Sequence, residues 1–199
     1  MPSGSGSREG DRTSRLAVSL GINVADLAAL RELVIETLSP LGLDGSAVFA
    51  RLADGGSFGE ALGVSTGVIE LIYARAHQWF AVGQTERAEA LFEALCVLAP
   101  ASADHWVGYG VCLKARSALQ EAAQAFDRAA ELRPEWAIPR FHATEVAVLT
   151  GAWAAAADAL TAFEYRVAAD VPPAMIREMA RVRAAISARG GAEAGALAW

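Results

Sequence analysis

The sequence contains little lysine and little cysteine. Its 199 residues include a single lysine, Lys114, and only two cysteines, Cys96 and Cys112. Two thiols are too few to form a disulfide framework in a chain of this length. Both cysteines stand in apolar stretches with helical spacing, so we expect them to be buried as small apolar residues.

Motifs that carry chemistry are missing as well. The three histidines, His77, His105 and His142, fall in three different predicted helices, and together with the two cysteines they make no zinc pattern. The glycine clusters lack the strand-to-helix setting of a phosphate loop, and no serine stands in a nucleophile elbow. We therefore expect no catalytic residue, no metal and no cofactor, and we interpret the protein as a non-enzyme.

Basic charge is scarce. Lysine and arginine together number 17 against 23 acidic residues, which gives a formal net charge of −6. Nucleic-acid binding depends on a basic patch or stripe that meets the phosphate backbone. The sequence has none, so we expect no nucleic-acid partner.

Long apolar runs are also absent. Residues 1–10 contain no apolar stretch, which argues against a signal peptide. The longest uncharged run that leans apolar, residues 146–157, has twelve residues and is too short to span a bilayer. We therefore expect a cytoplasmic protein that does not insert directly into a membrane.

Alanine, by contrast, is abundant, with 45 residues. Because alanine is the strongest helix former, the composition predicts an all-α protein. Residues 1–20 are predicted to be a disordered tail, and residues 21–64 an N-terminal helical segment that could mediate dimerisation. Within that segment, Asn23 is placed to cap a helix over 23–38, and Ser57 and Glu60 have the spacing of a capping box.

From residue 69 onward the chain repeats every 34 residues. This is the period of the tetratricopeptide repeat (TPR), a helix–turn–helix unit. The sequence predicts repeats at 69–102, 103–136 and 137–168, a capping helix at 169–189 and a flexible tail at 190–199. The matching positions are Gly83, Ser117 and Gly151; Ala88, Ala122 and Ala156; Phe92, Phe126 and Leu160; and Pro100 and Pro134.

Each repeated position has a predicted mechanical role. Small residues such as Gly110 let the two helices of a repeat approach closely, and Gly83 and Gly151 break the chain between them. Ser117, with Gln120, is predicted to cap the following helix instead. The fold expected is an all-α TPR superhelix of three repeats, with N-terminal helices and a C-terminal capping helix.

The first helix of each repeat is predicted to line a concave groove. Because most groove positions are apolar, we expect a bound ligand, although the capping segments could cover the groove instead. A Lys/Arg/Asn clamp for a terminal carboxylate is absent, so an extended segment anchored on aromatic residues fits better. The predicted peptide-binding groove consists of Tyr73, His77, Phe80, Val107, Val111, Lys114, Phe141, Glu145 and Val148.

Four stretches carry a more specific resemblance. They are residues 71–77, residues 90–98 with a Phe-x-x-Leu-Cys-x-Leu core, residues 108–112, and residues 139–145 with a Phe-His-Ala-x-Glu run. Neither run is demanded by the repeat itself. Together the stretches resemble the class II chaperones of type III secretion, the LcrH/SycD/IpgC type.

The resemblance implies a small all-helical cytoplasmic protein of a Gram-negative bacterium, connected with virulence. Such chaperones bind hydrophobic translocator proteins, hold an extended segment in the groove and keep the translocators soluble and secretion-competent. The resemblance also implies a transcriptional regulator as a further partner, and homodimerisation through residues 23–38 here. Tyr73, Phe80 and Phe141 match the groove aromatics of the family, whereas His77 replaces another aromatic residue.

Two other functions fit the same repeats. A needle-subunit co-chaperone of the same secretion system would hold an amphipathic helix rather than an extended strand. A general TPR scaffold would bind several unrelated partners through protein–protein interactions.

Overall fold

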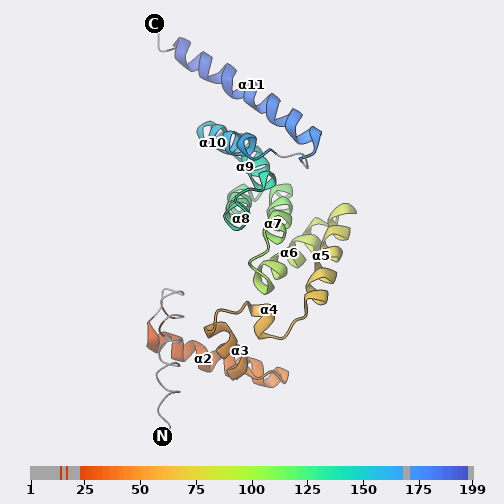
Figure 1. Ribbon diagram of the computed structural model, residues 1–199, viewed down its shortest axis with the longest axis vertical. Coiled ribbons are helices and arrows are strands. Elements are labelled where there is room, and N and C mark those ends of the chain that lie inside the picture. Colours follow the sequence, from red (N-terminus) through yellow and green to blue (C-terminus); the bar gives the residue numbers. More distant parts are fainter. Residues whose placement is uncertain (1–13, 15–16, 18–22, 168–170, 197–199) are drawn as a thin grey trace. The chain divides into compact units, whose positions relative to one another are not determined.

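The computed structural model describes residues 14, 17, 23–167 and 171–196, and every element in this part of the chain is a helix (Figure 1). Most of the predicted tail over residues 1–20 lies outside the described residues. The chain divides into two compact units, one formed by residues 1–71 and 97–99 and the other by residues 72–96 and 100–199.

Side-chain caps begin three helices of the first unit, at Asn23, Asp44 and Ser57. Asn23 caps the first of them by accepting a hydrogen bond from the backbone N–H of Asp26 at 2.9 Å. Ser57 and Glu60 form both hydrogen bonds of a capping box, as predicted. Leu27 is fully buried with Phe49. The elements are α2 (Val24–Leu38), the 3-10 helix η1 (Ser39–Leu41), α3 (Gly45–Ala53) and α4 (Phe58–Ala61).

Three helix pairs and a last long helix follow, which confirms the all-α TPR fold. The sequence predicts repeat helices at about 67–82, 86–98, 103–116, 118–132, 136–149 and 153–167, and the observed ends lie within two residues of these in all six. They are α5 (Thr66–Ala81) and α6 (Thr85–Leu98), α7 (Ala103–Ala115) and α8 (Leu119–Leu132), and α9 (Ala137–Leu149) and α10 (Trp153–Tyr165), followed by α11 (Pro173–Ala196).

Close packing within the pairs depends on small residues facing large ones. A Cβ atom at Gly110 of α7 would come closer than 3.0 Å to the ring of Phe126 in α8, a distance that real side chains do not adopt. Phe92 and Phe126 are almost fully buried, at 1% and 0% exposure. Side-chain volume is therefore tightly matched across these helices, as in other protein interiors.

The turns inside the pairs share one geometry. Gly83, Ser117 and Gly151 all have a left-handed φ, of 77°, 68° and 72°. At Ser117, the backbone N–H bonds Lys114 O and the next N–H bonds Leu113 O, the pattern of a Schellman helix end. The predicted Ser117 cap is wrong: the residue ends α7, and α8 has Ala118 as its N-cap with no side-chain hydrogen bond.

Replacing Ser117 by glycine is expected to stabilise the protein by about 1 kcal/mol, because a side chain in the left-handed region meets its own backbone. Chemical denaturation would measure the free energy of unfolding. Ser187→Gly, at an exposed position of α11, is the matched control and should destabilise by about 0.5 kcal/mol. A loss of stability in both variants would contradict this account of the turn.

The helix α11 covers the end of the repeat array. Met179 is 1% exposed and belongs to a cluster with Leu160 and Phe163, against which Met175, Val182 and Ile186 pack. The end repeat of a solenoid exposes an apolar flank that needs a cover, and the apolar side of this helix provides that cover. The helix continues to Ala196, beyond the expected end at residue 189.

Candidate functional site

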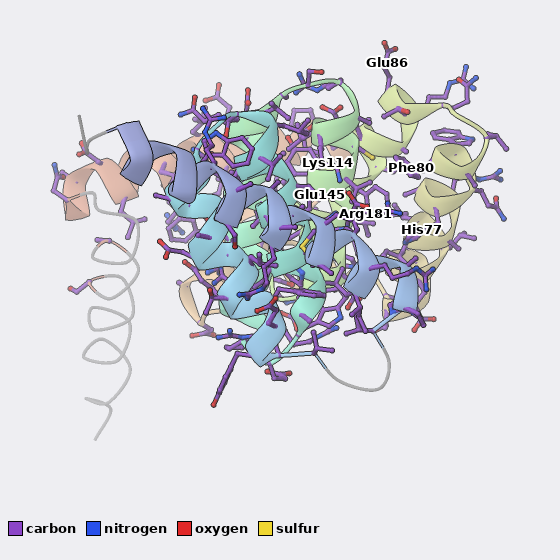
Figure 2. The ribbon with its side chains drawn as sticks, turned by 90° about the horizontal axis from the view of Figure 1, so that it is seen from above. His77, Phe80, Glu86, Lys114, Glu145 and Arg181 are labelled. Carbon is purple, nitrogen blue, oxygen red and sulfur yellow. The ribbon has the colours of Figure 1, made fainter. Side chains whose placement is uncertain are left out.

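The nine predicted groove residues come from α5, α7 and α9, the first helix of each pair. We call these nine residues the A-helix face. His77 is exposed, Phe141 is buried, and the other seven are half-buried. Figure 2 labels His77, Phe80, Lys114 and Glu145 among the side chains. Most of the A-helix face therefore remains accessible to a partner.

Tyr73 of α5 stands in a group of rings. Its ring centroid lies 4.5 Å from His77 and 6.0 Å from Phe92, both in edge-on arrangements, and 5.6 Å from His105. Burial, with help from the negative charge of Asp104, raises the pKa of Tyr73. These neighbours hold the phenol ring in one orientation, as an aromatic anchor requires.

Lys114 and Glu145 form an ion pair that links the second repeat to the third. His142 Nδ1 lies 2.7 Å from Glu145 Oε2 and 3.3 Å from Lys114 Nζ. Since Nδ1 cannot donate and accept at once, the short contact identifies it as a donor to the carboxylate. The imidazole stacks on Phe126 with 5.0 Å between centroids. We call Lys114, His142 and Glu145 the polar cluster.

His142 was not among the predicted site residues. Its spacing of three from Glu145 places both side chains on the same face of α9, and this was the signal available in the sequence. Burial lowers the pKa of His142 and so favours the neutral ring. Burial also opposes the charge on Glu145, but the hydrogen bonds from His142 and Lys114 outweigh it and lower the pKa of that carboxyl.

Acidification is expected to destabilise the protein through His142. Its pKa is lowered by folding from the ordinary 6.5, so the unfolded chain binds a proton more readily. The contribution of His142 to stability is therefore complete above pH 6.5 and is lost as the pH falls through 6.5 towards the lowered pKa of the folded state. Thermal unfolding midpoints across this range measure the effect.

The matched variants for this test are His142→Asn and His77→Asn. The first keeps a donor towards Glu145 but cannot titrate, so its pH dependence should be flatter than that of the parent. The second changes an exposed ring and should leave the pH dependence intact. An unchanged slope in His142→Asn would contradict the assignment.

Phe141, a predicted anchor, is only 7% exposed. Its ring lies 6.1 Å from that of Phe163 and joins the apolar cluster under α11. Replacing Phe141 by a smaller residue would disturb the packing under α11 as well as any binding on the A-helix face. Tyr73 is therefore the better residue with which to test binding.

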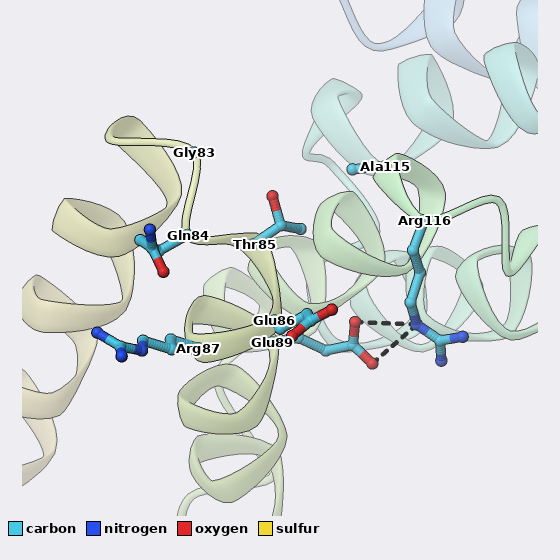
Figure 3. A pocket seen from close by; sticks show the side chains of 8 residues that line it. All are labelled: Gly83, Gln84, Thr85, Glu86, Arg87, Glu89, Ala115 and Arg116. Carbon is cyan, nitrogen blue, oxygen red and sulfur yellow. Dashed lines mark hydrogen bonds and ion pairs between the residues drawn. The ribbon is translucent and has the colours of Figure 1, made fainter.

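Two hollows lie outside the A-helix face and were not predicted. The first, of about 450 Å³, is polar, and in it Arg116 Nε bonds both carboxylate oxygens of Glu89 at 3.0 and 2.9 Å (Figure 3). The second, of about 560 Å³, lies between α8, α9 and α10, and half of the residues that line it are alanines. The Arg140–Asp127 ion pair, at 3.0 Å, stands at its edge.

Both cysteines are buried, as expected, and burial raises the pKa of each thiol to about 12. Among the described residues, no group of three His, Cys, Asp or Glu side chains is placed to hold a metal ion. No described helix combines the length and the apolar character that crossing a bilayer requires.

The paired helices, the repeated turns and the capping helix define a TPR protein. No protein-family model and no curated protein matches the chain. Solved structures do match it. A type III secretion complex from Aeromonas hydrophila is 25% identical, with a TM-score of 0.63, over 74% of this chain and 97% of that one.

Two further structures show the same likeness. The translocator chaperone SycD of Yersinia enterocolitica is 25% identical, with a TM-score of 0.58, over 67% of this chain and 98% of its own. PcrH of Pseudomonas aeruginosa, solved with the chaperone binding region of PopD, is 27% identical, with a TM-score of 0.58, over 64% and 97%. In fold and in sequence the chain is therefore similar to class II chaperones of type III secretion, the LcrH/SycD/IpgC type.

Proposed function

We propose that this protein is a cytoplasmic chaperone of a type III secretion system that binds hydrophobic translocator proteins and keeps them soluble and secretion-competent. The likeness to SycD and PcrH carries the proposal, because both were solved with segments of translocators: SycD with a peptide of YopD, and PcrH with the chaperone binding regions of PopD and PopB. The match covers nearly the whole length of both chaperones, 98% of SycD and 97% of PcrH.

In the proposed complex, an extended segment of the translocator lies along the A-helix face. The half-buried aromatic and aliphatic side chains of this face, Tyr73, Phe80 and Val107 among them, offer apolar contacts for alternate side chains of such a segment. A chaperone that acts by stoichiometric binding alone needs no catalytic residue and no cofactor.

Two finer proposals concern other partners. The first is homodimerisation through α2, where Leu30 and Leu33 are 37% and 58% exposed; a SycD structure is described as an alternative dimer. The second is contact with a transcriptional regulator in the Gram-negative host, which rests on the family resemblance alone.

Co-expression tests the function. A translocator from the same secretion locus should stay soluble when this chain is present and aggregate when it is absent. Recovery of needle subunits instead would favour the co-chaperone function, and recovery of several unrelated proteins would favour the scaffold.

Replacing Tyr73 by alanine is expected to weaken translocator binding by about 2 kcal/mol, because anchoring aromatics dominate such interfaces. Calorimetric titration with the soluble translocator segment measures the loss. Tyr165→Ala is the matched control, because that ring is 88% exposed at the end of α10. Normal binding by Tyr73→Ala would exclude the A-helix face as the binding site.

A further inference from the structure

The polar cluster interrupts an otherwise mainly apolar surface. The side chains of Lys114, His142 and Glu145 are only 20%, 13% and 28% exposed. Val111 precedes Lys114 by one helical turn, and Val148 follows Glu145 by one turn; both valines are half-buried. A segment that covers these valines would also cover the cluster.

The cluster has hydrogen-bonding capacity left over. Lys114 carries three N–H donors and uses one of them on Glu145 Oε2, which also receives the hydrogen of His142 Nδ1. No described residue donates to Glu145 Oε1, and none accepts the other two ammonium hydrogens. Donors and an acceptor therefore lie side by side, open to whatever covers the A-helix face.

The charge of the cluster limits what that cover can be. One ammonium and one carboxylate cancel, and burial keeps His142 neutral. An acidic side chain would be repelled by Glu145, and a basic side chain would be repelled by Lys114. An apolar side chain would strip water from the ion pair and return no hydrogen bond, which is costly for buried polar groups.

A neutral amide satisfies both halves of the cluster, because its carbonyl accepts from Lys114 while its N–H donates to Glu145 Oε1. We propose that the polar cluster is a subsite that sets the register of the bound segment by taking one amide group, either from an Asn or Gln side chain or from the peptide backbone. This inference rests on the proposed function, since it concerns the same segment on the A-helix face.

A library of displayed random peptides about twelve residues long, enough to run extended across the face, supplies the probe. It is selected in parallel on the parent protein and on a variant carrying Lys114→Met and Glu145→Met. An apolar pair of similar size is usually tolerated in place of a buried ion pair. The control variant carries Arg116→Met and Glu89→Met and so loses an ion pair outside the A-helix face.

We expect the parent and the control to select Asn or Gln at one fixed position between apolar residues, and the Lys114/Glu145 variant to lose that preference. Changing the selected amide residue to Met should weaken binding about tenfold on the parent and less than twofold on the variant. If the backbone supplies the amide, no such residue is enriched, and replacing one peptide bond by an ester gives the tenfold loss on the parent only.

Two results would overturn the inference while leaving the proposed function in place. One is selection of the same peptides, with equal affinity, by the parent and the Lys114/Glu145 variant. The other is enrichment of a charged or apolar residue at the position over the cluster. If no peptide binds the parent at all, both the proposed function and the inference fail.

Discussion

Phe126→Ala is expected to lower the free energy of unfolding by about 3–5 kcal/mol. The ring is fully buried in the cluster that joins α7, α8 and α9, with Leu113 and Val146. It also fills the space left by Gly110, so no neighbouring side chain can move in to replace it. Deleting the ring leaves a cavity between two repeats, and the cost of a cavity adds to the lost burial.

Urea denaturation followed by circular dichroism measures this loss. Tyr165→Ala removes a ring that is 88% exposed, and it should change stability by less than about 0.5 kcal/mol. The cavity account would be wrong if the two variants lost similar amounts. Because His142 stacks on Phe126, the substitution is also expected to loosen the polar cluster.

The repeat made most of this core predictable. A period of 34 residues places Ala88, Ala122 and Ala156 at the same contact, and all three are fully buried. Phe92 and Phe126 follow from the same register. The period is a consequence of packing, because each helix pair must bury its apolar side against the next. The register of the repeat in the sequence therefore predicts which residues form the buried core.

The turn at Ser117 was harder to predict because two local patterns compete there. A serine followed three residues later by Gln120 suggests a helix cap. The repeat register instead demands a left-handed residue, as at Gly83 and Gly151, and the structure follows the register. Tertiary packing fixes the path of the chain between α7 and α8, and the serine adopts the conformation that this path requires.

The sequence predicted part of the polar cluster. Lys114 is equivalent to Val148 one repeat later, and Glu145 stands one helical turn before that valine. Both were predicted to face the groove, but whether two such side chains meet depends on the rotation of α9 against α7. That rotation is set by side chains such as Phe126 and by the cap over Phe141, so the ion pair needed the structure.

Gly108→Ala is expected to destabilise the protein by about 3 kcal/mol, although alanine normally strengthens a helix by about 1 kcal/mol over glycine. The sequence singled out Gly110 as the close-contact residue, but Gly108 is packed as tightly. A Cβ atom there would come closer than 3.0 Å to the Phe92 ring. That ring is 1% exposed and is flanked by Tyr73 and His77.

The Phe92 ring therefore has no free space into which it can turn, and α6 and α7 would have to separate. Gly67→Ala provides the matched control, because a Cβ atom at that position in α5 meets nothing within 4 Å. It should stabilise the protein by up to about 1 kcal/mol through helix propensity alone. The two substitutions are chemically identical, so opposite signs in their free energies of unfolding isolate the contact with Phe92. Because the same ring supports Tyr73, Gly108→Ala should also weaken translocator binding, and Gly67→Ala should leave it unchanged.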